Sequence, residues 1–338
     1  MLARLSDASV QVSGELTRWS LAEMQATGVA TGLTALAGEL GIFDDADDGV
    51  VAYVAEQREQ VRQRVQLFGD LLPSVMDALQ RTAIPAVAVK GAALIQGVWA
   101  SAGTRPMADI DIVVPLAQRA QAAAALVGAG LRPIESTVYE DTFLAWGDGG
   151  IGRTDGESAA HNGRVEVHPG WVEFLHGYTV RGFAVESTPF DHEALTTHVL
   201  GHLASTVVRA EVRAVNVVDV WWCLRRPIDW HRVDVLMADT DPRLTAPAMW
   251  LIQKLMPDLM PAAAVHREMH RLPVAARRAL SMIEPGEVLR DPSGRTPLRW
   301  RQAFTMSARE RVAVVDQMLW PAGARSVSTA LRRLIGRR

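Results

Sequence analysis

Residues 84–115 read IPAVAVKGAALIQGVWASAGTRPMADIDIVVP, and this stretch decides the fold. An apolar run at 87–89 predicts a buried strand, and the alanine-containing segment at 92–100 predicts a helix. The alternating segment at 109–114 predicts a second strand. A strand, a glycine turn, a helix and another strand in succession indicate a small sheet built together with helices.

The second strand begins with two carboxylates, Asp109 and Asp111. Residues two apart on a strand point to the same face, so the two side chains are expected to project side by side. Two adjacent negative charges repel each other, and a divalent cation between them would relieve the repulsion. Carboxylate oxygens are the ligands that Mg²⁺ prefers. Without metal, replacing either aspartate by asparagine is expected to raise the melting temperature.

The pattern Lys90-Gly91, then Arg105, then Asp109-Ile-Asp111-Ile-Val-Val resembles the polymerase-β-type nucleotidyltransferase superfamily. Within that superfamily the chain is most similar to a bacterial family of uncharacterised nucleotidyltransferases. That family carries the motif KGAAL followed by R-P-M-x-D-I-D-[IL]-[VL]-V. The resemblance is dense over this stretch and thinner beyond it. It implies an α+β fold, in which N-terminal helices and a C-terminal helical domain flank a small mixed β-sheet core.

The resemblance also implies a third acid on a later strand. Glu166 is the best match, because it lies in an alternating segment at 164–168, while Glu173 and Asp155 are rival candidates. The aspartate pair and Glu166 would then be both the metal ligands and the catalytic residues. A set of carboxylates without histidine or cysteine fits Mg²⁺ or Mn²⁺ better than Zn²⁺.

Four residues are implied to contact the nucleotide: Lys90, Gly91, Ala92 and Arg105. A glycine at the strand-to-helix turn lets backbone N–H groups approach a phosphate. The two cations would contact the triphosphate, and Lys90 is one of only two lysines in the chain. The superfamily usually has Gly or Ser where this chain has Ala92, which removes a hydroxyl contact.

The implied reaction is the Mg²⁺-dependent transfer of an NMP group from an NTP, such as ATP, to an acceptor hydroxyl with release of pyrophosphate. A small molecule or peptide is the expected acceptor, with tRNA or protein as a toxin-like alternative. A third alternative is a catalytically silent NTP-binding or interaction protein on the same fold. The sequence does not predict the NTP base or the oligomeric state.

The composition and charge of the chain narrow the class of protein further. The 338 residues carry a formal net charge of −3 and are 49% hydrophobic, which excludes a strongly basic nucleic-acid binder as a description of the whole chain. Beyond Ala264, however, fifteen arginines stand against six acids. No apolar run reaches the length of a membrane span, and the single cysteine, Cys223, forms no internal disulfide. We therefore expect a cytoplasmic protein with no membrane partner.

Three regions are predicted: N-terminal helices at 1–81, a nucleotidyltransferase core at 82–190, and C-terminal helices with a basic tail at 191–338. In the core, strands are expected near 131–136 and 142–146, with the strand at 164–168 closing the sheet.

The segment at 50–81 has the apolar stripe of an amphipathic helix. Pro73 is expected to kink that helix or split it in two, because proline lacks the N–H that continues a helix. Arg62 and Arg64 are expected on its solvated face.

Several polar residues allow two interpretations. His198 and His202 are four apart on a predicted helix and could bind zinc, although a helix-face role is favoured because no glutamate follows the first histidine. Asp219 could face the cleft or pair with an arginine such as Arg213 or Arg225. His168 shares a strand face with Glu166, so it could line the cleft or play a structural role.

Overall fold

A computed structural model of the chain describes residues 20–22, 25, 32–99, 102–145, 163–185, 190–283 and 298–319. It confirms an α+β fold built on a five-stranded mixed sheet with the strand order β1-β2-β5-β4-β3. The strands are β1 (Val87–Ala88), β2 (Asp109–Val114), β3 (Arg132–Ser136), β4 (Asp141–Leu144) and β5 (Arg164–Pro169). Only β2 and β5 pair in parallel, and the other neighbours are antiparallel.

Strand β5 lies in the middle of the sheet, between β2 and β4. The strand that was predicted to close the sheet therefore joins its two halves. Its inward side chains, Val165 and Val167, are both fully buried. A strand with both neighbours in place hides these residues better than an edge strand would, which is consistent with the central position.

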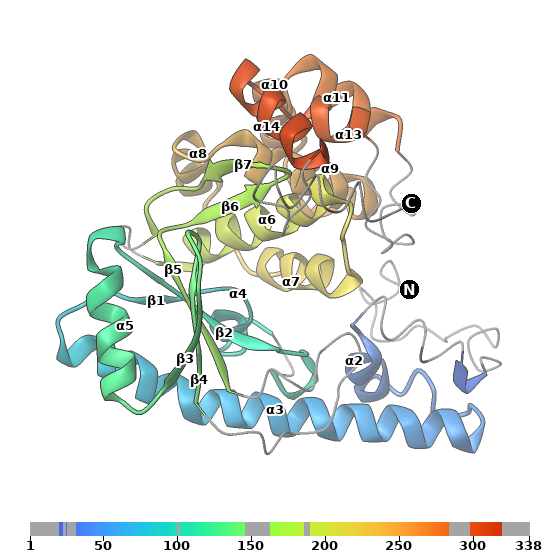
Figure 1. The fold of residues 1–338 in the computed structure, drawn as a ribbon. Helices are drawn as coiled ribbons and strands as arrows, with labels where there is room; N and C mark the ends of the chain where they lie inside the picture. The colour runs from blue at the N-terminus through green and yellow to red at the C-terminus, as the bar shows by residue number, and fades with distance from the viewer. Residues whose placement is uncertain are drawn as a thin grey trace, which may run out of the picture.

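Two helices cover one face of the sheet, as Figure 1 shows: α3 (Asp48–Arg81) and α5 (Arg119–Gly128). Ile110 and Ile112 of β2 pack there with Phe68 of α3 in one apolar core. Because strand side chains alternate, the polar residues between them face the opposite side of the sheet. The candidate site is built on that opposite face.

Helix α3 continues without interruption through Pro73, so the predicted split is wrong. The ring of a proline crowds the carbonyl of the residue four positions earlier, which here is the exposed Gly69. The apolar stripe on both sides of Pro73 remains on one side of the helix and packs on the sheet, which offsets the lost hydrogen bond. Arg62 is exposed as predicted, but Arg64 is only 2% exposed and donates to the backbone carbonyl of Met107.

The helix predicted at 92–100 is shorter than expected. Helix α4 comprises Lys90–Leu94, and turns follow it. Gly97 has a φ of 134°, a backbone conformation that a helix does not accommodate, so the chain turns toward β2 there. The 3-10 turn η3 (Ala102–Thr104) leads into β2, and η4 (Leu116–Gln118) leads from β2 into α5.

The remaining described elements pack on the side of the sheet opposite α3, apart from α2 (Thr34–Glu39), which packs on α3. A hairpin that the sequence did not predict, β6 (Val172–Leu175) and β7 (Tyr178–Arg181), follows β5 directly. The other elements are α6 (His192–Arg209), α7 (Ala214–Leu224), α8 (Trp230–Ala238), η6 (Pro242–Leu244), α9 (Ala246–Leu255), η7 (Pro257–Leu259), α10 (Ala262–Arg271), α11 (Val274–Ser281), α13 (Leu298–Ala303) and α14 (Ala308–Leu319). Within the described part of the chain, none of the helices combines the length and the apolar character needed to cross a bilayer.

Candidate active site

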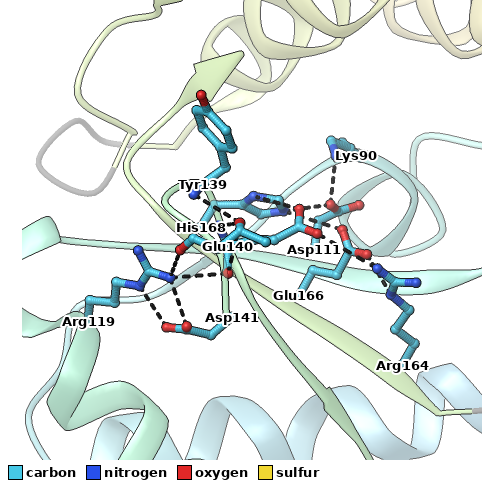
Figure 2. A network of polar contacts seen from close by, with 10 residues as sticks. Lys90, Asp111, Arg119, Tyr139, Glu140, Asp141, Arg164, Glu166 and His168 are labelled. Carbon is cyan, nitrogen blue, oxygen red and sulfur yellow. Dashed lines mark hydrogen bonds and ion pairs between the residues drawn. The ribbon is translucent and has the colours of Figure 1, made fainter. Parts of the chain in front are cut away.

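Charged side chains gather on the face of the sheet that α3 and α5 leave open. The parallel strands β2 and β5 are in register, with Asp111 opposite Glu166 and Val113 opposite His168. Residues opposite one another in a sheet share a face, so Asp111, Glu166 and His168 project together. One possible ligand atom from each of the three lies within 4.8 Å of the others, and Figure 2 shows them side by side. We call these three residues the acid–histidine cluster.

Two cationic or polar groups contact the same oxygen of Asp111. Lys90 Nζ donates to Asp111 Oδ1 at 2.7 Å, and His168 Nε2 lies 2.9 Å from that oxygen. Burial would raise the pKa of Asp111, but the Lys90 ammonium and His168 outweigh it and hold that pKa well below its usual range. Among the described residues nothing donates to Oδ2 of Asp111, so this oxygen can bind a cation.

Lys90 reaches Asp111 from the turn between β1 and α4. Its φ of 49° is in the left-handed region, which few residues with a side chain adopt and which costs about 1–2 kcal/mol. Burial would lower the pKa of the Lys90 ammonium. The carboxylates of Asp111, Glu173 and Asp109 outweigh burial, and the pKa is raised. Lys90 is therefore held as a cation over the acid–histidine cluster.

Glu166 is the second acid of the cluster. Arg164 Nε forms an ion pair with Glu166 Oε1 at 2.6 Å, and His168 Nε2 lies 3.8 Å from Oε2. Burial and the negative charges of Asp111 and Glu140 raise the pKa of Glu166. This carboxylate is consequently a better proton acceptor than an exposed glutamate.

Asp109 lies on the same strand face but is not one of the three residues that converge within 4.8 Å. It is half-buried at the start of β2, and its charge acts on Lys90. The structure brings His168 beside the two acids, because His168 follows Glu166 by two residues and therefore shares its face, which is one of the two roles that the sequence allowed for it. Glu173, a rival third acid, lies on β6 outside the cluster, and Asp155 lies outside the described residues.

Arg105 is paired with a residue outside the acid–histidine cluster. Its guanidinium forms two parallel hydrogen bonds with Asp219 of α7, Nε to Oδ1 at 2.8 Å and Nη2 to Oδ2 at 2.7 Å. The two residues are 8% and 2% exposed. The hydrogen-bonding partner of Asp219 is therefore Arg105, and the charge of Arg213, one of the arginines that the sequence suggested, also acts on the Asp219 carboxylate.

Gly91 packs directly against the Arg105 guanidinium. A Cβ at position 91 would collide with Arg105 Nη1, whose side chain Asp219 holds in place. The structure thus gives a packing reason for glycine at this turn, in addition to the approach of a phosphate that the sequence suggested. Ala92 is buried beside it.

We expect Gly91→Ala to lower the free energy of unfolding by about 1–3 kcal/mol, because the new methyl group overpacks a contact that cannot relax. Chemical denaturation measures this change. The matched control is Gly69→Ala in the exposed part of α3, where a Cβ meets nothing within 4 Å. That variant should be more stable by about 0.5–1 kcal/mol. A Gly91→Ala protein as stable as the wild type would contradict the packing.

A cavity of about 300 Å³ adjoins the acid–histidine cluster. It is bounded by Lys90 on the β1–α4 turn, His168 on β5, Glu173 on β6, and both His198 and His202 on α6. The two α6 histidines therefore face the candidate site. Among the described residues they belong to no group of metal-ligand atoms, so the zinc interpretation gains no support.

His198 and His202 are neutral in the folded protein. Burial lowers the pKa of His198 to about 3, with a further contribution from the nearby Lys90 ammonium. Burial also lowers the pKa of His202 well below its usual value. In both residues Nδ1 is buried and has no hydrogen-bond partner within the part of the chain that the structure describes.

A pH dependence of stability follows. Below the ordinary histidine pKa of 6.5, unfolded chains bind a proton at position 198 that the native protein does not bind, so stability falls as the pH drops from 6.5 toward 3. Each such group contributes up to about 1.4 kcal/mol per pH unit. We expect His198→Gln to reduce the slope between pH 4 and 6 by about that amount in urea titrations. The control is His270→Gln, because His270 is exposed. If the free energy of unfolding changed with pH equally in the wild type and in His198→Gln, the burial of His198 would be contradicted.

The residues present fit a divalent cation. Two carboxylates converge with one imidazole, and Thr142, opposite Glu166 on β4, has a buried hydroxyl that finds no hydrogen-bond partner among the described residues. A water molecule bound to the cation could form a hydrogen bond with that hydroxyl. Carboxylates suit Mg²⁺ and Mn²⁺, and the imidazole is a better ligand for Mn²⁺ or Zn²⁺ than for Mg²⁺.

The fold and the site define an α+β protein with a candidate divalent-cation centre on the two parallel strands of a mixed sheet. Residues 18–257 match the family described as an uncharacterised nucleotidyltransferase, and the chain belongs to that family. No curated protein and no solved structure matches the chain. The match confirms the resemblance seen in residues 84–115. It makes nucleotidyl transfer the class of reaction and implies an NTP as substrate.

Proposed function

We propose that this protein is a Mg²⁺- or Mn²⁺-dependent nucleotidyltransferase that moves an NMP group from an NTP to an acceptor hydroxyl. The observation that carries the proposal is the register of β2 and β5, which places Asp111, Glu166 and His168 within 4.8 Å of one another. Asp111 and Glu166 would hold the cation, with Asp109 available on the same face. A bound cation would stabilise charge on the α-phosphate and lower the pKa of the attacking hydroxyl.

The chain's own residues supply the remaining chemistry. The acceptor oxygen attacks the α-phosphorus, the bond to the β-phosphate oxygen breaks, and pyrophosphate leaves with that bond's electron pair. The acceptor's proton passes to Glu166, the carboxylate that lies beside Asp111 in the acid–histidine cluster. Lys90, next to Asp111, is the described cation best placed to meet the triphosphate.

The test supplies each of the four α-³²P-labelled NTPs with Mg²⁺ or Mn²⁺, and a lysate as the source of acceptors. We expect label to move to an acceptor with one cation present and not with EDTA. Glu166→Gln should abolish transfer while leaving the melting temperature within a few degrees of the wild-type value. Cation-dependent NTP binding without transfer would instead indicate a silent NTP-binding protein.

A further inference from the structure

The cavity beside the acid–histidine cluster is lined by charged side chains. Lys90 and His168, which both contact Asp111, form its inner end. A molecule in this cavity would therefore contact Lys90 and His168, the two residues that bond to Asp111. The outer walls come from the β3–β4 turn, β6 and α6.

Glu173 is the acid in this wall that has no partner. It is half-buried on β6 and, among the described residues, it makes no hydrogen bond and no ion pair. Its charge is felt by Lys90, but that ammonium is bonded to Asp111. A second acid, Glu140, lies on the opposite wall, 3.7 Å from Arg164 and 3.9 Å from His168.

The cations of the cavity are already engaged. Lys90 donates to Asp111, and Arg209 at the end of α6 pairs with Glu211 at 3.3 Å. A phosphate or carboxylate placed against β6 would therefore face Glu173 and compete with Glu211 for Arg209. A protonated amine would meet an unpaired carboxylate instead.

Uncharged polar groups complete the wall. His198 is 2% exposed and Trp171 is 4% exposed, and His198 Nδ1 and Trp171 Nε1 lack hydrogen-bond partners among the described residues. Their ring centroids lie 4.6 Å apart, with the ring planes tilted by 43°. His198 is neutral at physiological pH, so it adds hydrogen-bonding capacity without positive charge. Buried polar atoms of this kind usually have a partner, and a ligand could supply one.

From this arrangement we infer that the cavity binds the acceptor, and that the acceptor carries a protonated amine that pairs with Glu173 near the hydroxyl to be modified. The inference rests on the proposed function and specifies its acceptor. The hydroxyl would be presented toward Asp111 and Glu166, attack the α-phosphorus and lose its proton to Glu166 as pyrophosphate leaves. The amine remains protonated, paired with Glu173, and forms no covalent bond.

The test measures binding by calorimetry to the full chain with Mg²⁺ and a non-hydrolysable α,β-methylene NTP. Two matched probe pairs differ only in amine charge: a glucosamine disaccharide against its N,N′-diacetyl form, and an N-acetyl-seryl-lysine amide against its Nε-acetyl form. We expect the amine to bind at least about tenfold more tightly than the acetylated partner in one pair or both. Glu173→Gln should remove the preference, and Glu135→Gln, an exposed acid of β3, should keep it.

A thermal melt verifies that Glu173→Gln is folded, and Glu173→Asp, which keeps the charge, should retain part of the preference. No preference in either pair, or a preference that survives in Glu173→Gln, would overturn the inference. A change in base preference in Glu173→Gln would also overturn it, by assigning the cavity to the nucleobase. Loss of cation-dependent NTP binding in the wild type would instead reject the proposed function.

Discussion

Asp111→Asn is expected to lower nucleotidyl transfer by about a thousandfold or more, because it removes the carboxylate on which the cation site is centred. The structure also reverses the expected effect on stability. Lys90 and His168 hold the Asp111 pKa below its usual range, so the charged form stabilises the fold at every pH above the ordinary aspartate pKa. Asparagine leaves the partly buried Lys90 ammonium without that partner, at a cost of about 3 kcal/mol.

Transfer assays and urea denaturation of the same protein preparation measure both effects. Asp77→Asn is the control, because Asp77 forms an exposed pair with Arg81 on α3. That control should keep full activity and lose at most about 0.5 kcal/mol. An Asp111→Asn protein that is more stable than the wild type would show that repulsion between the two aspartates outweighs the Lys90 contact.

The second large effect is expected at the buried pair between Arg105 and Asp219. Asp219→Ala should lower the free energy of unfolding by about 3–5 kcal/mol, since it leaves a buried guanidinium without its carboxylate. The exposed pair of Arg267 and Asp234 is the control. Breaking that pair with Asp234→Ala should cost no more than about 1 kcal/mol. Equal losses of unfolding free energy in Asp219→Ala and Asp234→Ala would contradict the burial of the pair between Arg105 and Asp219.

Replacing both partners separates structure from nucleotide binding. The double variant Arg105→Met with Asp219→Leu should recover most of the lost stability, because an apolar pair leaves no unpaired charge. If the pairing seen in the structure is the role of Arg105, this variant should bind NTP within about threefold of the wild-type affinity. A well-folded double variant that no longer binds NTP would support the predicted contact between Arg105 and the triphosphate.

The local geometry of the site was predictable from the sequence. Alternation over Asp109–Val114 and over 164–168 places Asp111 and Glu166 on one face of their strands, and the structure confirms that placement. The same alternation carries the signal for His168, which is two residues after Glu166. That signal alone does not show that the His168 imidazole reaches Asp111 Oδ1, because the contact also depends on how the two strands pair.

Contacts between distant parts of the chain were not predictable. Arg105 and Asp219 are 114 positions apart, and nothing in either segment indicates which arginine Asp219 meets. Arg64 carries a charge on an amphipathic helix, so a solvated position was predicted, yet it is buried and donates to the carbonyl of Met107, just before β2. The central position of β5 likewise depends on strand pairing, which local propensity does not encode.

The most direct test of the account is Mn²⁺ binding followed by electron paramagnetic resonance. We predict that wild-type protein binds Mn²⁺ with a nitrogen coupling from His168, that His168→Gln loses this coupling, and that Asp111→Asn and Glu166→Gln each weaken binding at least tenfold. Mn²⁺ binding that is unchanged in Asp111→Asn and Glu166→Gln would contradict a cation site on β2 and β5.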